Sequence, residues 1–293
     1  MCMLRTLWLL VCIAALAPAL VAHAADGKAG CNQQLLPYVC DVLPENIPDF
    51  NREPDGGLLV KELRRGNPSL KEVALTFDDG PHPAYTSCIL AILHHYRVPV
   101  TFFMVGVQAA RYPEWVKMAF QEGHEIGSHT YDHFRLVGLP FDEQTYQIEE
   151  FQQLIFKLTG TYPRFLRPPG GSYNAQTVEL MNRNGLAVGL WSFNPKDLTD
   201  VAAQELYRSI LQNVSNGGVI MLHDGSAATV EMLPLLIETL KRRGYRFVTM
   251  SQMLAHADAK VLPRSAEAAE AEAPASPEPE EKPEPGRWKI ISY

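Results

Sequence analysis

The chain has 293 residues, of which 46% are hydrophobic, and its formal net charge is −7. This apolar content excludes a wholly disordered protein and suffices for one large α/β domain or two small ones. Seven Glu and one Lys fall within residues 265–286, so this stretch accounts for −6 and the remainder is near −1. A nearly neutral remainder without a Lys/Arg stripe argues against nucleic acid as a partner.

The first residues predict an export signal. Arg5 precedes an apolar run from Leu7 to Ala22, and Ala22-His23-Ala24 has the small-x-small pattern favoured before cleavage. The run is shorter than the roughly 20 residues of a membrane span, although an uncleaved anchor is the alternative. We therefore expect a signal peptide over residues 1–24 and an exported mature protein, periplasmic or secreted, monomeric and without a membrane span.

Cleavage would leave three cysteines in the mature chain. Export implies an oxidising compartment, in which Cys31 and Cys40 could form a disulfide, although sequence alone does not fix the pairing. Cys88 lies in an apolar helical stretch and is predicted to be a small buried hydrophobic residue. None of the three has the paired spacing of a structural zinc site.

The pattern along the chain divides it into three parts after the signal. Residues 25–69 carry scattered Pro and Gly without periodicity and are predicted to form an irregular N-terminal extension. From about residue 72, short apolar runs alternate with longer amphipathic ones. The short runs predict strands at Val73–Phe77, Pro99–Val105, His124–Ser128, Arg164–Leu166, Leu186–Phe193, Gly218–Leu222 and Arg246–Met250. The longer runs predict helices at Tyr85–Arg97, Pro113–Glu122, Glu143–Leu158, Ala175–Asn184, Ala203–Val214 and Val230–Arg243.

This strict alternation predicts an α/β fold with a parallel sheet, open or closed into a barrel. Roughly seven strands favour an incomplete parallel (β/α) barrel, expected over residues 70–258. After residue 258 the composition changes to Ala, Pro and Glu, so residues 259–293 are predicted to be a disordered tail. Its end, Arg287–Tyr293, regains apolar residues that could form a docking motif, although an inert end is favoured.

Candidate chemistry follows five of the first six predicted strands. In a parallel α/β fold the strand ends meet on one face, where active sites form. Each motif alone is a common turn or loop, and a polar rim without chemistry is the plain alternative. The five motifs are Thr76-Phe77-Asp78-Asp79-Gly80, His129-Thr130-Tyr131-Asp132-His133, Arg167-Pro168-Pro169-Gly170-Gly171, Asn194 with Asp197, and His223-Asp224.

Two of these motifs together predict a metal site. If residues 129–133 are helical, His129 and His133 project to the same side, as chelation requires. Two imidazoles and one carboxylate form an open three-ligand site, a common form of catalytic zinc. A second carboxylate beside the metal could act as a base, and the residues alone leave open whether Asp78 or Asp79 does so.

The order of the five motifs resembles the polysaccharide deacetylase family, also called carbohydrate esterase family four, over about residues 70–255. The resemblance implies a distorted parallel (β/α) barrel that hydrolyses acetamide groups on an N-acetylated glycan, with peptidoglycan or chitin-like N-acetylglucosamine expected first. It also implies a Zn²⁺ cofactor, with Co²⁺ or another divalent ion as an option. By this resemblance Asp78 is the general base, and Arg167 keeps Asp78 ionised. The metal ligands are Asp79, His129 and His133. His223 is the general acid, and Asp197 orients it.

The chain departs from the family pattern at two motifs. Gly170 stands where an aromatic residue is frequent, although its backbone N–H can still bind the oxyanion. Asn194 and Leu198 stand where Asp and Trp are usual, and Trp191 is expected to supply part of the lost apolar wall. Leu222 and Trp191 are expected to enclose the acetyl methyl group. These changes concern the shape of the substrate site more than the reaction.

Three alternatives remain beside an amidase. An esterase acting on an O-acetylated glycan such as acetylxylan is the nearest. A carbohydrate-binding pseudoenzyme should have lost a ligand or an acid/base residue, whereas this chain keeps them all. A non-haem iron oxygenase uses two His and one carboxylate, but the paired Asp, His223 and the β/α alternation argue against it.

Overall fold

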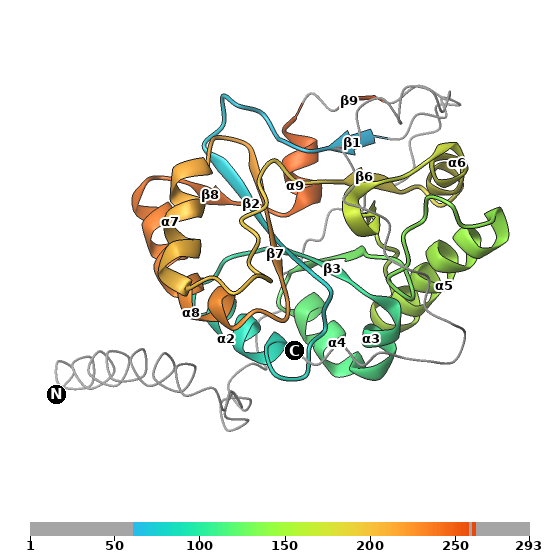
Figure 1. Ribbon diagram of the computed structural model, residues 1–293, viewed down its shortest axis with the longest axis horizontal. Helices are drawn as coiled ribbons and strands as arrows, with labels where there is room; N and C mark the ends of the chain where they lie inside the picture. The colour runs from blue at the N-terminus through green and yellow to red at the C-terminus, as the bar shows by residue number, and fades with distance from the viewer. Residues whose placement is uncertain (1–60, 258–259, 262–293) are drawn as a thin grey trace, which may run out of the picture.

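The computed structural model describes residues 61–257 and 260–261 (Figure 1). The predicted signal peptide, Cys31, Cys40 and the residues before 61 and after 261 lie outside this part. The strands are β1 Lys61–Leu63, β2 Glu72–Asp78, β3 Thr101–Met104, β4 Glu125–Ser128, β5 Phe165–Leu166, β6 Ala187–Gly189, β7 Gly218–His223, β8 Arg246–Phe247 and β9 Lys260–Val261. The helices are α2 Thr86–Tyr96, α3 Gly106–Arg111, α4 Pro113–Gln121, α5 Phe141–Thr159, the short 3₁₀ helix η2 Pro169–Gly171, α6 Ala175–Arg183, α7 Ala203–Asn213, α8 Ala227–Arg242 and α9 Met250–Ala255. None of the described helices meets the length and apolarity needed to cross a membrane.

One curled sheet forms the centre of the molecule, in the order β7-β2-β3-β4-β5-β6-β1-β9, with β8 also pairing with β2. From β7 to β1 neighbouring strands run parallel, and only β9 is antiparallel to its neighbour. The segment after β6 returns to β7 through a single bridge between Phe193 and Ile220. The sheet is therefore a barrel that is only partly closed.

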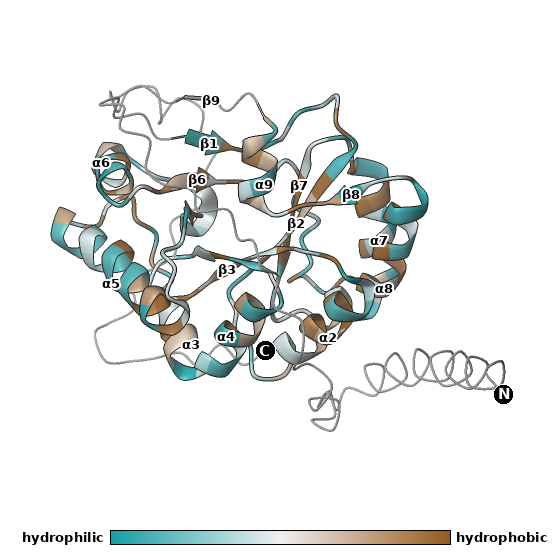
Figure 2. Ribbon diagram, turned by 180° about the vertical axis from the view of Figure 1, so that it is seen from behind, coloured by the Kyte–Doolittle hydropathy of each residue, from teal (hydrophilic) through white to brown (hydrophobic). Residues whose placement is uncertain are grey.

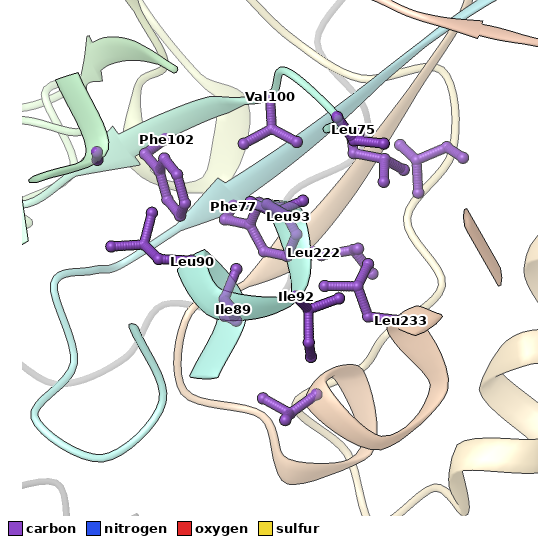
Figure 3. Packing of buried hydrophobic residues seen from close by; sticks show 14 of the residues in the cluster. Leu75, Phe77, Ile89, Leu90, Ile92, Leu93, Val100, Phe102, Leu222 and Leu233 are labelled. Carbon is purple, nitrogen blue, oxygen red and sulfur yellow. The ribbon is translucent and has the colours of Figure 1, made fainter. Parts of the chain in front are cut away.

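The helices surround the sheet, and their polar faces point outward (Figures 1 and 2). All seven residues of β2 are buried, because one side of this strand faces helices and the other faces the barrel interior. Leu75 and Phe77 pack against Leu93 of α2 and Leu233 of α8 (Figure 3). Ala74, which alternates with them, packs inside the barrel in a separate cluster.

The predicted fold class, an incomplete parallel (β/α) barrel, is confirmed, and each predicted helix overlaps an observed one. Gly160 ends α5 with φ 75°, the left-handed conformation that glycine adopts readily after a helix. Cys88 is buried on α2, also as predicted.

Several predicted boundaries were wrong. The predicted extension contains β1, which pairs with β6, and β9 lies beyond the predicted domain end at residue 258. Three residues are too few to show the alternation of a strand. The predicted strand Arg246–Met250 ends at Phe247, because Thr249 caps α9 through its side chain and Met250 is already helical. Helix α3 also escaped prediction, since six residues give no helical period.

The burial of β1 generates a stability prediction. Leu63 is 1% exposed and packs among Ala74, Phe103 and Met250 inside the barrel, whereas Leu235 on α8 is 41% exposed. Leu63→Ala should therefore lower the free energy of unfolding by about 2–5 kcal/mol, and Leu235→Ala by much less. Urea titration of both variants checks this. Equal, small losses would show that β1 contributes little to the domain.

Candidate active site at the carboxyl ends of the strands

The centre of the site is a buried ion pair between β2 and the segment after β5. The Arg167 side chain is fully buried, and its Nη1 donates to Asp78 Oδ1 at 2.5 Å and to Thr76 Oγ1 at 2.8 Å. Its other nitrogens donate to the carbonyl oxygens of Gly189 (2.9 Å) and Leu190 (3.1 Å). Each of the three guanidinium nitrogens thus has an acceptor, the buried cation makes four hydrogen bonds, and one Asp78 oxygen is occupied by it.

An aromatic ring supports this guanidinium from within the barrel. Arg167 Cζ lies 3.9 Å from the ring centroid of Phe103, which is fully buried. Two glycines make room for that ring: a Cβ atom at Gly127 or at Gly189 would lie 2.7 Å from a Phe103 ring carbon. Any larger residue there would have to displace the ring that the guanidinium rests on.

His129 is held in one orientation by the same segment. Its Nδ1 lies 2.7 Å from the carbonyl oxygen of Arg167, and since a carbonyl can only accept, Nδ1 carries the proton and Nε2 has a lone pair. Burial lowers the pKa of His129 to about 4, despite the opposing charges of Asp78 and Asp79. A neutral imidazole with a fixed tautomer is the form that binds a metal.

Asp79 and His133 complete a cluster of possible ligands. Asp79 Oδ1 lies 3.2 Å from His133 Nε2 and 3.5 Å from His129 Nε2. Burial alone would raise the pKa of Asp79, but the contact with His133 and the positive charge that the nearby imidazoles carry when protonated lower it below its usual range. The carboxyl group of Asp79 is therefore ionised near neutral pH.

Residues 129–133 are not helical, so the condition under which the two imidazoles were expected to face the same side is not met. Thr130 and His133 have φ of 66° and 62°, in the left-handed region that a helix excludes, so the two imidazoles meet through a turn. Their ring centroids are 4.8 Å apart. The prediction that both rings face the same point holds, but its physical reason was wrong.

These three residues fit a divalent cation. Their ligand atoms all lie within 4.8 Å of one another. Asp79 Oδ1 is buried and has no partner with hydrogen-bond geometry among the described residues. A buried anionic oxygen is costly without a counter-charge, and an ion bound between two imidazoles and this oxygen would supply one.

His223 and Asp197 form a second charged pair, next to Asp78 on the neighbouring strand. Asp78 and His223 are direct partners in the parallel register, so the two side chains start from neighbouring positions at the same sheet edge. His223 Nδ1 lies 2.7 Å from Asp197 Oδ1, and its backbone N–H donates to Asp197 Oδ2 at 2.8 Å. Thr229 Oγ1 also donates to Asp197 Oδ2, which fixes the carboxylate.

The contacts of His223 with Asp197 determine its protonation state. Burial alone would lower the pKa of His223, but the hydrogen bond and the charge of Asp197 outweigh burial and raise the pKa to about 9. His223 is therefore protonated near neutral pH and its Nε2 can donate a proton. The predicted partnership of Asp197 and His223 is thus present in the geometry.

The expected substrate-wall residues divide into two groups. Gly170 is exposed in the loop after β5, and the half-buried Trp191 packs close to the neighbouring Gly171. Leu222, in contrast, is fully buried among Phe77 and Leu233 on the helix side of β7 (Figure 3). The prediction that Leu222 lines the site was wrong, because alternate residues of a strand face opposite ways.

Strand alternation indicates that Met221, and not Leu222, shares a face of β7 with His223. Met221 lies two residues after Val219, which packs inside the barrel, and directly before Leu222. Met221 and His223 lie two residues apart on the face of β7 opposite Leu222. Met221 is the apolar neighbour of His223 at the same sheet edge, where it pairs in register with Thr76.

A further residue with an unexpected place is Asp224. It is 1% exposed, its backbone N–H donates to the carbonyl oxygen of Asp78, and its Oδ2 accepts from Thr86 Oγ1 at 2.6 Å. Burial raises its pKa to about 7. The side chain also fills the space that a Cβ atom at Gly80 would need. Asp224 therefore connects β7 and α2 to the turn that carries Asp79, a role that its place in the His223-Asp224 motif did not indicate.

The sequence of this chain is similar to those of known polysaccharide deacetylases. The chain is 35% identical over 191 residues to a peptidoglycan-N-acetylglucosamine deacetylase of Bacillus cereus, covering 64% of this chain and 89% of that protein. It is 35% identical over 187 residues to a peptidoglycan-N-acetylmuramic acid deacetylase of Bacillus subtilis, of which it spans only 39%. A chitooligosaccharide deacetylase of Azorhizobium caulinodans is 32% identical over 188 residues, 59% of this chain and 90% of that protein.

Solved structures give the same result. A crystal structure of a peptidoglycan N-acetylglucosamine deacetylase aligns with a TM-score of 0.64 at 35% identity, over 66% of this chain and 92% of the other. A pseudoenzyme of carbohydrate esterase family four from Bacillus anthracis aligns with a TM-score of 0.62 at 26% identity, over 65% and 68% of the two chains. The profile of the polysaccharide deacetylase family matches residues 65–214. The chain belongs to the polysaccharide deacetylase family.

Proposed function

We propose that this protein is an exported, metal-dependent amidase that removes acetyl groups from an N-acetylated glycan, with cell-wall N-acetylglucosamine as its first substrate. The observation that carries the proposal is the register of β2 and β7, which pairs Asp78 with His223 beside the cluster of Asp79, His129 and His133. A proton acceptor, a proton donor and a set of metal ligands thus share one sheet edge. Relatives named as peptidoglycan and chitooligosaccharide deacetylases support the substrate class.

The proposed ligands are Asp79, His129 and His133, with Zn²⁺ as the preferred ion. A divalent cation bound there supplies Lewis-acid polarisation of the acetamide carbonyl and lowers the pKa of water. The neutral state of His129 and the ionised state of Asp79 leave both groups ready to bind without first losing a proton. His133, whose side chain is 46% exposed, forms the open side of the cluster.

The two proton transfers are assigned to Asp78, which is paired with Arg167, and to His223, which is paired with Asp197. Asp78 Oδ1 is occupied by Arg167, so Oδ2, 3.9 Å from His129 Nε2, accepts the proton of the attacking water. The Gly170 N–H is assigned to the developing oxyanion. His223 Nε2 then gives a proton to the leaving nitrogen, which departs poorly as an anion. The products are acetate and a free amino sugar.

Acetate release tests the proposal directly. Zinc-loaded residues 25–261 are incubated in parallel with peptidoglycan, chitin oligomers and acetylxylan. We expect release from an N-acetylated polymer. Release from acetylxylan alone would favour the esterase, and binding without any release would favour a pseudoenzyme.

Metal removal should abolish activity, and added Zn²⁺ or Co²⁺ should restore it. His129→Ala should lower metal affinity by more than the roughly 10–100-fold that loss of an outer-shell partner costs. His95→Ala, on the exposed surface of α2, is the matched control and should keep its metal. Metal content and acetate release are measured on the same samples. Full activity of a metal-free preparation would refute the proposed role of the metal.

The base and the acid should be separable by the leaving group. Asp78→Asn and His223→Ala should both keep the metal and lose about 10²–10⁴-fold in rate on an acetamide. An activated aryl acetate departs without protonation, so His223→Ala should retain much of its activity on that ester. Asp78→Asn should fail on both substrates, because water attack is needed either way. Equal losses by His223→Ala on ester and amide would mean that His223 does not protonate the leaving group.

The pH profile should depend on Asp197. The protonated form of His223 is required, and Asp197 raises its pKa to about 9, so amidase activity should fall as the pH rises through that range. Asp197→Asn removes the charge that raises the pKa, and the alkaline limb should move to lower pH by about one unit or more. Rates are measured from pH 6 to about 10 at matched metal content, with the aryl acetate as control. An unmoved alkaline limb would show that another group sets it.

A further inference from the structure

A positive charge lies at the rim of the site beside Gly170. Arg135 belongs to the loop between His133 and α5 and is exposed. A Cβ atom built on Gly170 would meet three atoms of the Arg135 guanidinium group, at 3.4 Å (Nε), 3.5 Å (Cζ) and 3.7 Å (Nη2). The space that a side chain at position 170 would enter is therefore bordered by this cation.

The loop fixes the backbone on which Arg135 is carried. The next residue, Leu136, is fully buried and packs with Leu166 and Leu190 at the ends of β5 and β6. The Leu136 carbonyl oxygen accepts a hydrogen bond from the N–H of Leu139. Arg135 thus extends from an anchored turn, and its position beside Gly170 does not depend on a freely moving segment.

Arg135 has no counter-ion of its own among residues 61–257. Neither an ion pair nor a hydrogen bond joins its guanidinium group to a described side chain, whereas Arg64, Arg183 and Arg246 each contact a Glu. A planar cation with five donors binds a carboxylate through two parallel hydrogen bonds. Its donors remain available at the position where a glycan would enter.

We propose that Arg135 binds a carboxylate on a sugar next to the one that is deacetylated, so that the enzyme prefers an anionic N-acetylated glycan to a neutral one. This inference rests on the proposed function and names its substrate class. Gly170 is part of the device, since the absence of a side chain leaves the guanidinium group open to the substrate. The reaction itself needs no such charge, so Arg135 acts on binding and not on proton transfer.

The test compares two forms of one glycan. Peptide-free strands of alternating N-acetylglucosamine and N-acetylmuramic acid carry lactyl carboxylates, and methylamidation of those groups removes the charge without changing the backbone. Calorimetric Kd values for both forms are measured on the full chain with the metal chelated, and acetate release is measured on the zinc-loaded protein. The variants are Arg135→Gln, Arg135→Lys and Arg208→Gln, the last an exposed arginine on α7 with the same change in net charge.

The wild-type protein and Arg208→Gln should bind the carboxylate form roughly 5- to 50-fold more tightly than the amidated form. Arg135→Gln should bind both forms equally, while its rate on amidated strands stays within about twofold of wild type, because the charge serves only the carboxylate. Arg135→Lys should keep part of the preference, since it retains the charge without the planar fork. No preference in the wild type, or a preference kept by Arg135→Gln, would overturn the inference. Absent acetate release with an intact binding preference would instead count against the proposed amidase.

Discussion

The geometry of the site depends on the buried pair of Arg167 and Asp78. The guanidinium group joins β2 to the segments after β5 and β6, and the carbonyl oxygen of the same residue holds His129. A buried cation and anion lose their hydration, and such a pair is tolerated where hydrogen bonds offset that loss. Here four hydrogen bonds from the guanidinium group fix three strand ends relative to one another. Removing either side chain would leave the other as an uncompensated buried charge, whereas the backbone carbonyl that holds His129 would remain.

The sheet and the site place different demands on the same strands. On β2, Leu75 and Phe77 pack against the helices, while Thr76 and Asp78 point to Arg167 in the interior. Alternation therefore puts the apolar contacts that stabilise the strand and the polar groups of the site on opposite faces. The barrel interior near the site contains an ion pair and a ring where aliphatic side chains are usual.

Elements long enough to show several repeats of the helical or strand period could be predicted from the sequence. Helices such as Phe141–Thr159 span several turns, and polar motifs at five strand ends indicated one common edge. The three-residue β1 and the six-residue α3 and α9 are too short for a period to appear. Their formation depends on tertiary partners: β1 exists because β6 offers it an unpaired edge.

Within the site, residue identities were more predictable than directions. The turn between His129 and His133 needs left-handed φ angles at two non-glycine residues, which no propensity suggests. Leu222 was misplaced because a motif does not say which way a side chain faces, although alternation with His223 would have done so. The roles of Asp224 and Arg135 depend on neighbours more than 30 residues away in the chain, Thr86 and Gly170, which only the folded structure brings near.

The glycines under Phe103 have a consequence for how loss of activity is recognised in such proteins. Gly127 and Gly189 carry no charge, yet a methyl group on either would displace the ring that packs against the guanidinium group bonded to Asp78. A chain altered there would retain every acid, base and ligand that a motif search inspects. To judge whether a deacetylase-like sequence encodes an active enzyme, one must therefore also inspect the small residues that line the barrel interior. Changed packing at those positions can abolish activity although every catalytic residue is present.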